Sequence, residues 1–273
     1  MTENLALNKQ LPIGVFDSGI GGLTVVKAIM QRLPHESIIY FGDTARVPYG
    51  IKSAQTIQQF SQQIVDFLLN KGVKLLVIAC NTIAAVAAEE LQKLTPIPIL
   101  DVLVAGAKAA VAATHKQQVG VIGTLTTIHS QAYDRAILRL NPQIQIFSQA
   151  CPLLVPLVEE GWLDHPVTQL TAQEYLQPLL AYQAIDTLVL GCTHYPLLKP
   201  LLAKIAGPGV ALVDSADTLA AEIEQVLILN GSQQNPGEIP HYEFYVSDVP
   251  QRFQKIGEQF LGRALPHIHV VGL

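Results

Sequence analysis

The chain has 273 residues, of which 49% are hydrophobic and 14% charged, with a formal net charge of −5 at pH 7. That is enough apolar material for one large domain or two smaller ones. The 17 Lys and Arg residues are scattered rather than gathered into a basic stripe, which argues against nucleic acid as a principal partner. No stretch approaches the roughly 18 apolar residues of a spanning helix, and the first residues lack a secretory pattern, so we expect a cytoplasmic protein with no membrane partner.

Short aliphatic runs alternate with helical patterns along the chain. Runs of four to six residues bounded by turn residues are typical of buried parallel strands, so the predicted fold class is α/β. The predicted strands are 13–16, 37–41, 74–79, 118–123, 143–147, 186–191 and 210–214.

One helix is predicted in detail. Apolar residues from Ile57 to Phe67 recur at spacings of three and four, Ser53 is suited to cap the N-terminus, and Gly72 follows the end. The Pro, Gly and Gln rich segment 230–240 is predicted to be a surface loop.

The chain contains a weak internal repeat. Segment 13–22 resembles segment 119–127, and a strand ending in cysteine follows each at a similar distance. Either the chain consists of two homologous halves, or similar βα units simply recur in it. In the first case the carboxyl edges of two sheets face one cleft, where open α/β sheets bind ligands. We expect a first α/β domain from residues 1–102 plus 214–273 and a second from 103–213.

The cysteines are three in number, without a CxxC pair, which does not suggest a disulfide framework. Cys80 lies where a strand ends and a helix is predicted to begin, and a helix N-terminus lowers a thiol pKa. Packing is the alternative, because cysteine is often buried. Cys192 also directly follows an aliphatic strand, and this second occurrence favours a chemical role for both cysteines. Cys151 has no comparable turn and is expected either to be a packing residue or to support the site from behind.

Polar groups accompany both cysteines. Asn81, Thr82 and Thr193 offer donors for a carboxylate, although helix capping alone would explain them. His194 follows Cys192 by two residues and is a candidate base or proton relay. No further ligands occur at metal spacing, so no metal site is expected.

The segment DSGIGG (17–22) resembles a dinucleotide-binding turn, but Thr24 interrupts the fingerprint and Asp17 places negative charge beside the phosphates. An amino-acid substrate fits this segment better: Asp17 would accept from its ammonium group and Ser18 would donate to its carboxylate. A tight glycine turn is the plain alternative. Tyr49 and Gly50, in VPYG, either close over a ligand or form an ordinary turn.

Five stretches together, GVFDSGIGGLTV, YFGDTARVPYG, ACNTIAA, CPLLVPLVEEG and GCTHYPLL, resemble the glutamate racemases of the aspartate/glutamate racemase superfamily, in order and over most of the chain. The resemblance implies two pseudo-symmetric α/β domains, with mostly parallel sheets, facing a central cleft. It also implies cofactor-independent interconversion of L- and D-glutamate, supply of D-glutamate for peptidoglycan, and a homodimer.

The resemblance further implies individual roles. Cys80 is the base toward D-glutamate and Cys192 the base toward L-glutamate, with Asp17 beside the first thiol, His194 beside the second, and Glu159 an acid near the second. The implied substrate-binding residues are Asp17, Ser18, Tyr49, Gly50, Asn81, Thr82, Thr124, Thr193 and His194.

Inverting a stereocentre by proton transfer requires an acceptor on one face and a donor on the other, which two cysteines supply. Activity should then depend on pH in a bell-shaped way. Three alternatives stay open: a racemase for aspartate or another amino acid, a cysteine hydrolase with Cys192 as nucleophile and His194 as base, and an amino-acid-binding module without catalysis.

Overall fold

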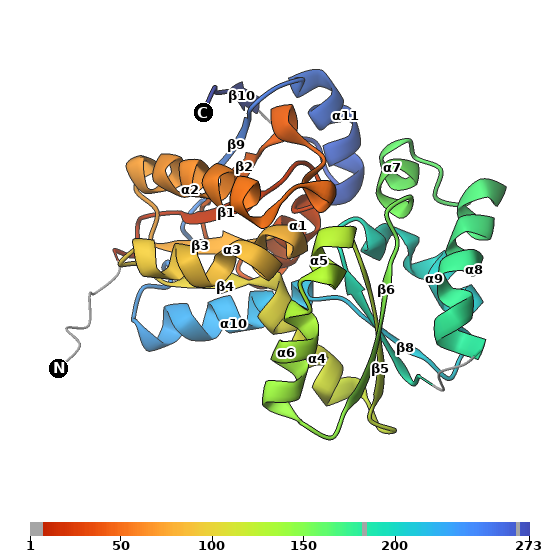
Figure 1. Ribbon diagram of the computed structural model, residues 1–273. Coiled ribbons are helices and arrows are strands. Elements are labelled where there is room, and N and C mark those ends of the chain that lie inside the picture. The colour runs from red at the N-terminus through yellow and green to blue at the C-terminus, as the bar shows by residue number, and fades with distance from the viewer. Residues whose placement is uncertain (1–7, 182–184, 266–267) are drawn as a thin grey trace.

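The computed structural model of the chain describes residues 8–181, 185–265 and 268–273, and contains two separate sheets (Figure 1). Every strand pairing within each sheet is parallel. The first sheet has the order β10-β9-β2-β1-β3-β4 and the second the order β6-β5-β7-β8. The strands of the first sheet are β1 (Ile13–Asp17), β2 (Ile38–Gly42), β3 (Leu75–Ile78), β4 (Ile99–Asp101), β9 (Tyr242–Val246) and β10 (Ile268–Val270). Those of the second sheet are β5 (Gln118–Gly123), β6 (Gln145–Ala150), β7 (Thr187–Gly191) and β8 (Ala211–Val213).

The two sheets share one strand order. In the first, β1 lies between β2 and β3, with β4 beyond β3; in the second, β5 lies between β6 and β7, with β8 beyond β7. The first two strands of each unit thus pair as neighbours, and the third returns to the other side of the first. This correspondence is the pseudo-symmetry expected from the internal repeat.

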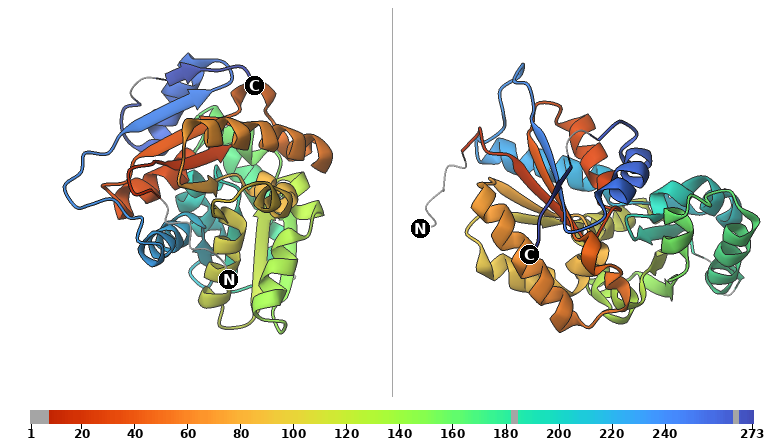
Figure 2. Two further views of the ribbon diagram at one scale, coloured as in Figure 1. Left: turned by 90° about the vertical axis from the view of Figure 1, so that its left-hand side faces the viewer. Right: turned by 90° about the horizontal axis from the view of Figure 1, so that it is seen from above.

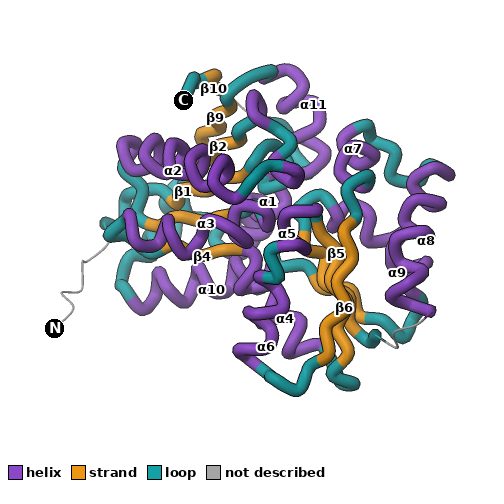
Figure 3. Tube along the Cα trace, in the orientation of Figure 1, coloured by secondary structure: helices purple, strands orange, loops and turns teal. Residues whose placement is uncertain are grey.

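Helices cover both faces of each sheet, as Figures 2 and 3 show. On the first sheet, α2 packs against α3 on one face, while α1 packs against α10 and α11 on the other. On the second, α4, α5 and α6 lie toward the first sheet, and α8 and α9 cover the outer side. The α-helices are α1 (Leu23–Arg32), α2 (Ala54–Lys71), α3 (Asn81–Leu94), α4 (Val102–Ala113), α5 (Leu125–His129), α6 (Ala132–Leu140), α7 (Leu154–Glu159), α8 (Pro166–Ala181), α9 (Lys199–Ala206), α10 (Ala216–Leu229) and α11 (Pro250–Leu261).

Helix α2 forms as its sequence predicts. The Ser53 side chain accepts a hydrogen bond from the Thr56 N–H, and Gly72 ends the helix in the left-handed conformation that glycine adopts without a steric penalty. Ile57 and Ile64 are fully buried on the face turned to the sheet. The helix thus returns the chain across the sheet, as a parallel β2-to-β3 connection requires.

The structure differs from the predicted strands in two ways. The run at 143–147 forms a strand only from Gln145, and that strand continues to Ala150, because β6 pairs in register with all of β5. Strands β4, β9 and β10 were not predicted: β4 and β10 have three residues each and are partly exposed, so they carry little periodic signal. The segment 230–240 has no helix or strand and is largely exposed, which confirms the predicted loop.

Strands β9 and β10 lie beside β2 although they come last in the sequence. The first sheet is therefore completed by the C-terminal part of the chain. Within the described ranges, no helix combines the length and the apolar character needed to cross a membrane.

Candidate active site

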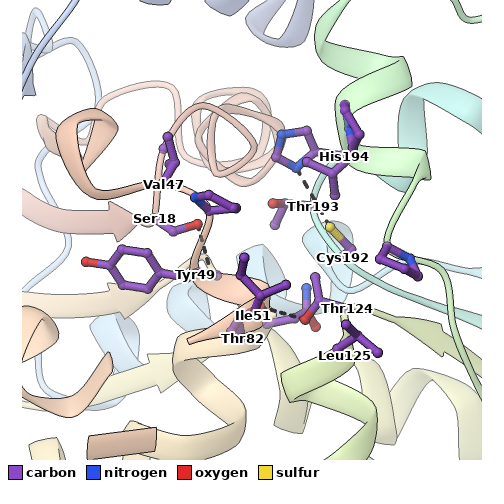
Figure 4. A pocket seen from close by; sticks show the side chains of 18 of the residues that line it. Ser18, Val47, Tyr49, Ile51, Thr82, Thr124, Leu125, Cys192, Thr193 and His194 are labelled. Atoms are coloured by element: carbon purple, nitrogen blue, oxygen red, sulfur yellow. Dashed lines mark hydrogen bonds between the residues drawn. The ribbon is translucent and has the colours of Figure 1, made fainter. Parts of the chain in front are cut away.

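The carboxyl ends of the strands of both sheets meet at one cavity of about 310 Å³ (Figure 4). Cys80 follows β3, Cys192 follows β7, Ser18 follows β1 and Thr124 follows β5. These four residues occupy corresponding places in the two sheets, and all line the cavity. Every residue predicted for the site lines it except Asp17; the others are Ser18, Tyr49, Gly50, Cys80, Asn81, Thr82, Thr124, Glu159, Cys192, Thr193 and His194.

Asp17 lies behind the cavity wall and is 1% exposed. Its Oδ2 accepts a hydrogen bond from the Gly19 N–H at 2.9 Å, while Oδ1 has no partner among the described residues. Burial raises the pKa of this carboxyl, against the opposing charge of His194 and the backbone N–H donors. Its position suits it to act on Cys80 rather than to contact a ligand directly.

Cys80 caps α3 by position, but its environment is not the one that the sequence predicts. Burial and the negative charge of Asp17 raise the pKa of the thiol to about 12, although Ser18 and the N–H groups at the start of α3 favour the thiolate. The Cys80 Sγ lies 3.5 Å from the Ser18 Oγ. The helix N-terminus was expected to lower this pKa, but desolvation in the closed cavity outweighs it. Cys80 is therefore a thiol near neutral pH.

The second side of the cavity contains a chain of three groups. The Nδ1 of His194 lies 3.7 Å from the Cys192 Sγ, and its Nε2 lies 3.1 Å from the Glu159 Oε1. Burial alone would lower the His194 pKa, but the hydrogen bonds to Cys192 and Glu159 raise it to about 10. For Glu159, burial acts to raise the pKa, and the contact with His194 reverses this, so the net shift is downward. An imidazolium is thus held between a sulfur and a carboxylate.

Helix α11, from the first unit, packs against this chain. The Phe260 ring meets the His194 ring edge-on at 5.3 Å, and the Arg252 guanidinium lies 3.6 Å from the Glu159 Oε2. Neither Phe260 nor Arg252 was identified from the sequence. No local motif marks them, because their roles depend on how α11 packs against residues of the second unit.

A cluster of threonines joins the two units beside the cavity. The Oγ1 of Thr82, at the start of α3, lies 2.9 Å from the Oγ1 of Thr124. Thr127 lies within 3.4 Å of the first and 3.0 Å of the second, and Thr126 donates to the Gly50 carbonyl at 3.0 Å. Thr126 and Thr127 were missed in the sequence, although both stand in the GTLTT run.

Tyr49 and Gly50 both line the cavity, and they do so in different ways. The Tyr49 hydroxyl donates to the Asp43 carboxylate, and in Figure 4 the ring points away from Cys192. The turn that it starts, Tyr49–Ile51, instead brings the backbone of Gly50 close to Thr124: a Cβ at Gly50 would lie 2.7 Å from the Thr124 Cβ. The remaining wall is apolar: Val47, Pro48, Ile51, Leu125, Pro152, Val155 and Pro156.

Cys151 does not line the cavity and is fully buried. Its Sγ contacts the Gln149 carbonyl, and its own carbonyl accepts a hydrogen bond from the Tyr195 hydroxyl at 2.9 Å. These contacts are compatible with either role expected for it, packing or support of the site from behind. Among the residues that the structure describes, no three His, Cys, Asp or Glu side chains come together as a metal site.

This geometry can move protons. Two thiol groups from equivalent strand ends reach one enclosed cavity, one of them beside an imidazolium, with amide and hydroxyl donors between them. Such a pair, on a fold of two parallel α/β units, defines an isomerase that removes a proton at one face of a substrate and returns it at the other.

The comparisons with known proteins agree. The sequence model of the Asp/Glu/Hydantoin racemase family matches residues 14–223, and the chain belongs to this family. The glutamate racemase of Syntrophus aciditrophicus is 64% identical over 265 residues, which are 96% of this chain and 97% of the relative. That of Neisseria meningitidis (serogroup A) is 61% identical over 268 residues, 98% of each chain. The crystal structure of glutamate racemase from Francisella tularensis, in complex with D-glutamate, matches with a TM-score of 0.91 at 43% identity, over 97% of this chain and 98% of that one. The predicted family and the two-domain α/β fold are thus confirmed.

Proposed function

We propose that this protein is a glutamate racemase that interconverts L- and D-glutamate by proton transfer between two cysteines. The observation that carries the proposal is that Cys80 and Cys192 follow equivalent strands of the two sheets and line the same cavity. High identity to glutamate racemases over nearly the whole chain supports glutamate rather than aspartate as the substrate.

Proton transfer between two cysteines requires the two sulfurs to start in different protonation states. Cys80 is a thiol, because burial and Asp17 raise its pKa to about 12. The proposed reaction from L-glutamate requires a thiolate at Cys192, and the imidazolium of His194 lies 3.7 Å from its Sγ, where it can pair with that charge. In this direction Cys192 accepts a proton and the Cys80 thiol donates one.

The reaction from L-glutamate then proceeds in two proton transfers. The Cys192 thiolate takes the α-proton, which leaves the electron pair on the α-carbon and its carboxylate. The Cys80 thiol gives its proton to the opposite face, which forms D-glutamate and leaves a thiolate at Cys80. The reverse reaction exchanges the two roles and restores the starting protonation. No redox change occurs.

The donors around the cavity stabilise the intermediate. Negative charge spreads onto the α-carboxylate when the proton leaves, so donors fixed beside that carboxylate lower the barrier. We assign this role to Asn81, Thr82 and Thr193, which line the cavity together with Ser18, which follows β1, and the Tyr49–Gly50 turn, which follows β2. Thr124 bridges the two by its contact with Thr82. Asp17 acts on Cys80 from behind, and Glu159 acts on Cys192 through His194.

Other parts of the proposal follow from the family resemblance and the sequence. The enzyme is a cytoplasmic homodimer that supplies D-glutamate for peptidoglycan, requires no cofactor or metal, and has no nucleic-acid partner. The first domain consists of residues 1–102 and 214–273 and the second of 103–213, a division supported by the membership of β9 and β10 in the first sheet.

The test follows α-deuteration and optical rotation of L- and D-glutamate in D₂O without added cofactor. We expect wild type to racemise both enantiomers and the Cys80→Ser and Cys192→Ser variants to lose nearly all racemisation. Cys151→Ser is the matched control, because its sulfur lies outside the cavity, and it should racemise like wild type.

The alternatives predict other outcomes. Racemisation of aspartate but not of glutamate would make aspartate the substrate. A trapped acyl-enzyme on Cys192 with an amide substrate, and indifference to Cys80→Ser, would favour the hydrolase. Binding of glutamate without exchange would leave a binding module.

A further inference from the structure

The side-chain amide of Asn81, in the cavity wall, has a hydrogen-bond partner at only one of its two ends among the described residues. Its Oδ1 accepts a hydrogen bond from the Tyr133 hydroxyl at 2.6 Å, whereas its buried Nδ2 has no partner among the described residues. The residue is 3% exposed, lines the cavity and directly follows Cys80 in the chain. A buried amide N–H without a partner is energetically unfavourable, which indicates that a ligand atom normally accepts from it.

Tyr133 comes from the other unit. It lies on α6, which packs against α4 beside the second sheet, while Asn81 begins α3 beside the first. The tyrosine is 2% exposed and does not line the cavity. Its hydroxyl therefore reaches the site only through Asn81.

The ring of Tyr133 packs closely against two glycines. A Cβ at Gly106, in α4, would lie 2.8 Å from the Tyr133 hydroxyl, and a Cβ at Gly191, where β7 ends, would lie 3.0 Å from the ring. The absence of side chains at these positions makes room for the ring. Because Gly191 directly precedes Cys192, the same packing connects Tyr133 to the strand end that carries the second sulfur.

We propose that Tyr133 is a positioning residue. Its hydroxyl donates a hydrogen bond to the Asn81 Oδ1 and so fixes the orientation of the amide. In this orientation Nδ2 is directed into the cavity as a donor to the substrate carboxylate. Without the hydroxyl, the amide is free to rotate and present its oxygen to the carboxylate, which repels it. The inference rests on the proposed function, since it assigns a substrate carboxylate to Nδ2.

The test is a double-mutant cycle on kcat/KM for glutamate racemisation. Tyr133→Phe removes the hydroxyl alone and should lower kcat/KM about tenfold, as expected when a positioned donor is lost. In the Asn81→Ala background the same change should lower kcat/KM less than about twofold, because no amide remains to be oriented. A purely structural tyrosine would cause the same loss in both backgrounds.

Two further variants keep the test decisive. Gly106→Ala places a methyl group against the hydroxyl and should reproduce the loss in wild type but not with Asn81→Ala. Tyr195→Phe is the matched control, because it removes another fully buried hydroxyl whose acceptor, the Cys151 carbonyl, is not a cavity group; it should leave kcat/KM within about twofold. Thermal melting of each variant identifies any that does not fold, and Gly106→Ala then takes the place of Tyr133→Phe.

The outcomes separate the two proposals. If wild type does not racemise glutamate, the proposed function fails. If wild type racemises but Tyr133→Phe equals it, or if its loss is unchanged in the Asn81→Ala background, the positioning role is wrong and the racemase assignment stands.

Discussion

Glu159 lies 3.1 Å from the ring nitrogen of His194 that faces away from Cys192, and this contact, together with the one to Cys192, keeps the buried ring charged. Burial by itself would favour neutral imidazole. The carboxylate on one side and the sulfur on the other reverse that preference. The protonation of His194 therefore depends on Cys192 and also on Glu159, a residue that contacts the far side of the ring.

The first prediction concerns this carboxylate. Glu159→Gln keeps the shape and removes the charge, so the pKa of His194 should fall and the alkaline limb of the kcat/KM profile should move to lower pH. Loss of a charge-assisted hydrogen bond of about 1.5–3 kcal/mol corresponds to a decrease of roughly 10- to 100-fold at the optimum. The measurement is kcat/KM for L-glutamate across the pH range.

Glu160→Gln is the matched control for that measurement. Glu160 is the next acid in the chain, and it contacts the exposed Arg252 rather than His194. Its pH profile should match that of wild type. An unshifted profile for Glu159→Gln would show that this carboxylate does not set the charge of the ring.

A second prediction concerns stability against pH. The His194 pKa is raised from 6.5 to about 10, so the folded state binds this proton more tightly than the unfolded state. The stability contributed by the proton is fully present below pH 6.5 and is lost as the pH rises toward 10. The free energy of unfolding should fall with pH in this window by at most about 1.4 kcal/mol per pH unit on account of this group.

Denaturant unfolding of wild type and His194→Asn at several pH values measures this contribution. The slope should be shallower in the variant. His241→Asn, at a largely exposed histidine, is the control and should keep the wild-type slope. Equal slopes in all three proteins would contradict the assignment.

A third prediction concerns the influence of Asp17 on Cys80. Its negative charge contributes to raising the pKa of that thiol to about 12, so Asp17→Asn should lower the pKa and increase the thiolate fraction. Alkylation of Cys80 by iodoacetamide near neutral pH, followed by mass spectrometry, should become about tenfold faster. Racemisation of L-glutamate should nevertheless decrease, because Cys80 must start as a thiol in order to donate its proton to the substrate.

Asp186→Asn provides the comparison for alkylation, since Asp186 is a buried aspartate before β7, at the opposite end of that strand from Cys192. The Cys80 alkylation rate should not change in this variant. A rate that is also unchanged in Asp17→Asn would mean that burial alone determines the state of the thiol.

A fourth prediction concerns the close approach of the two units at Gly21. A Cβ there would lie 2.2 Å from the Thr193 Oγ1 and 2.7 Å from the His194 Nδ1. Gly21→Ala should therefore push the second unit away from the first and reduce kcat/KM by roughly 100-fold or more, since misplacement by about 1 Å has effects of that size. Gly209→Ala, where a Cβ meets nothing within 4 Å, should be neutral. Comparable activity in both variants would show that the contact at Gly21 is not needed for catalysis.

Much of the fold could be predicted from local sequence. The aliphatic runs, the Ser53 cap and the Gly72 stop predict elements that the structure contains, because strand and helix periodicity and cap chemistry are properties of neighbouring residues. The two cysteine motifs predict the site for the same reason: a polar residue where a buried parallel strand ends must lie at the sheet edge. The short strands β4 and β10 could not be predicted, since three residues carry no clear period.

By itself, the sequence determined the α/β fold class, the family and the identity of the two thiols. The tertiary structure alone decided their electrostatic state and their partners: the raised pKa of Cys80, the charge on His194, and the contacts of Tyr133 with Asn81 and of Arg252 with Glu159. The physical reason is that burial and charge–charge distance depend on how the two units meet. Helix and strand periodicity are encoded within a few residues, whereas desolvation at Cys80 arises only when segments far apart in the chain close over it.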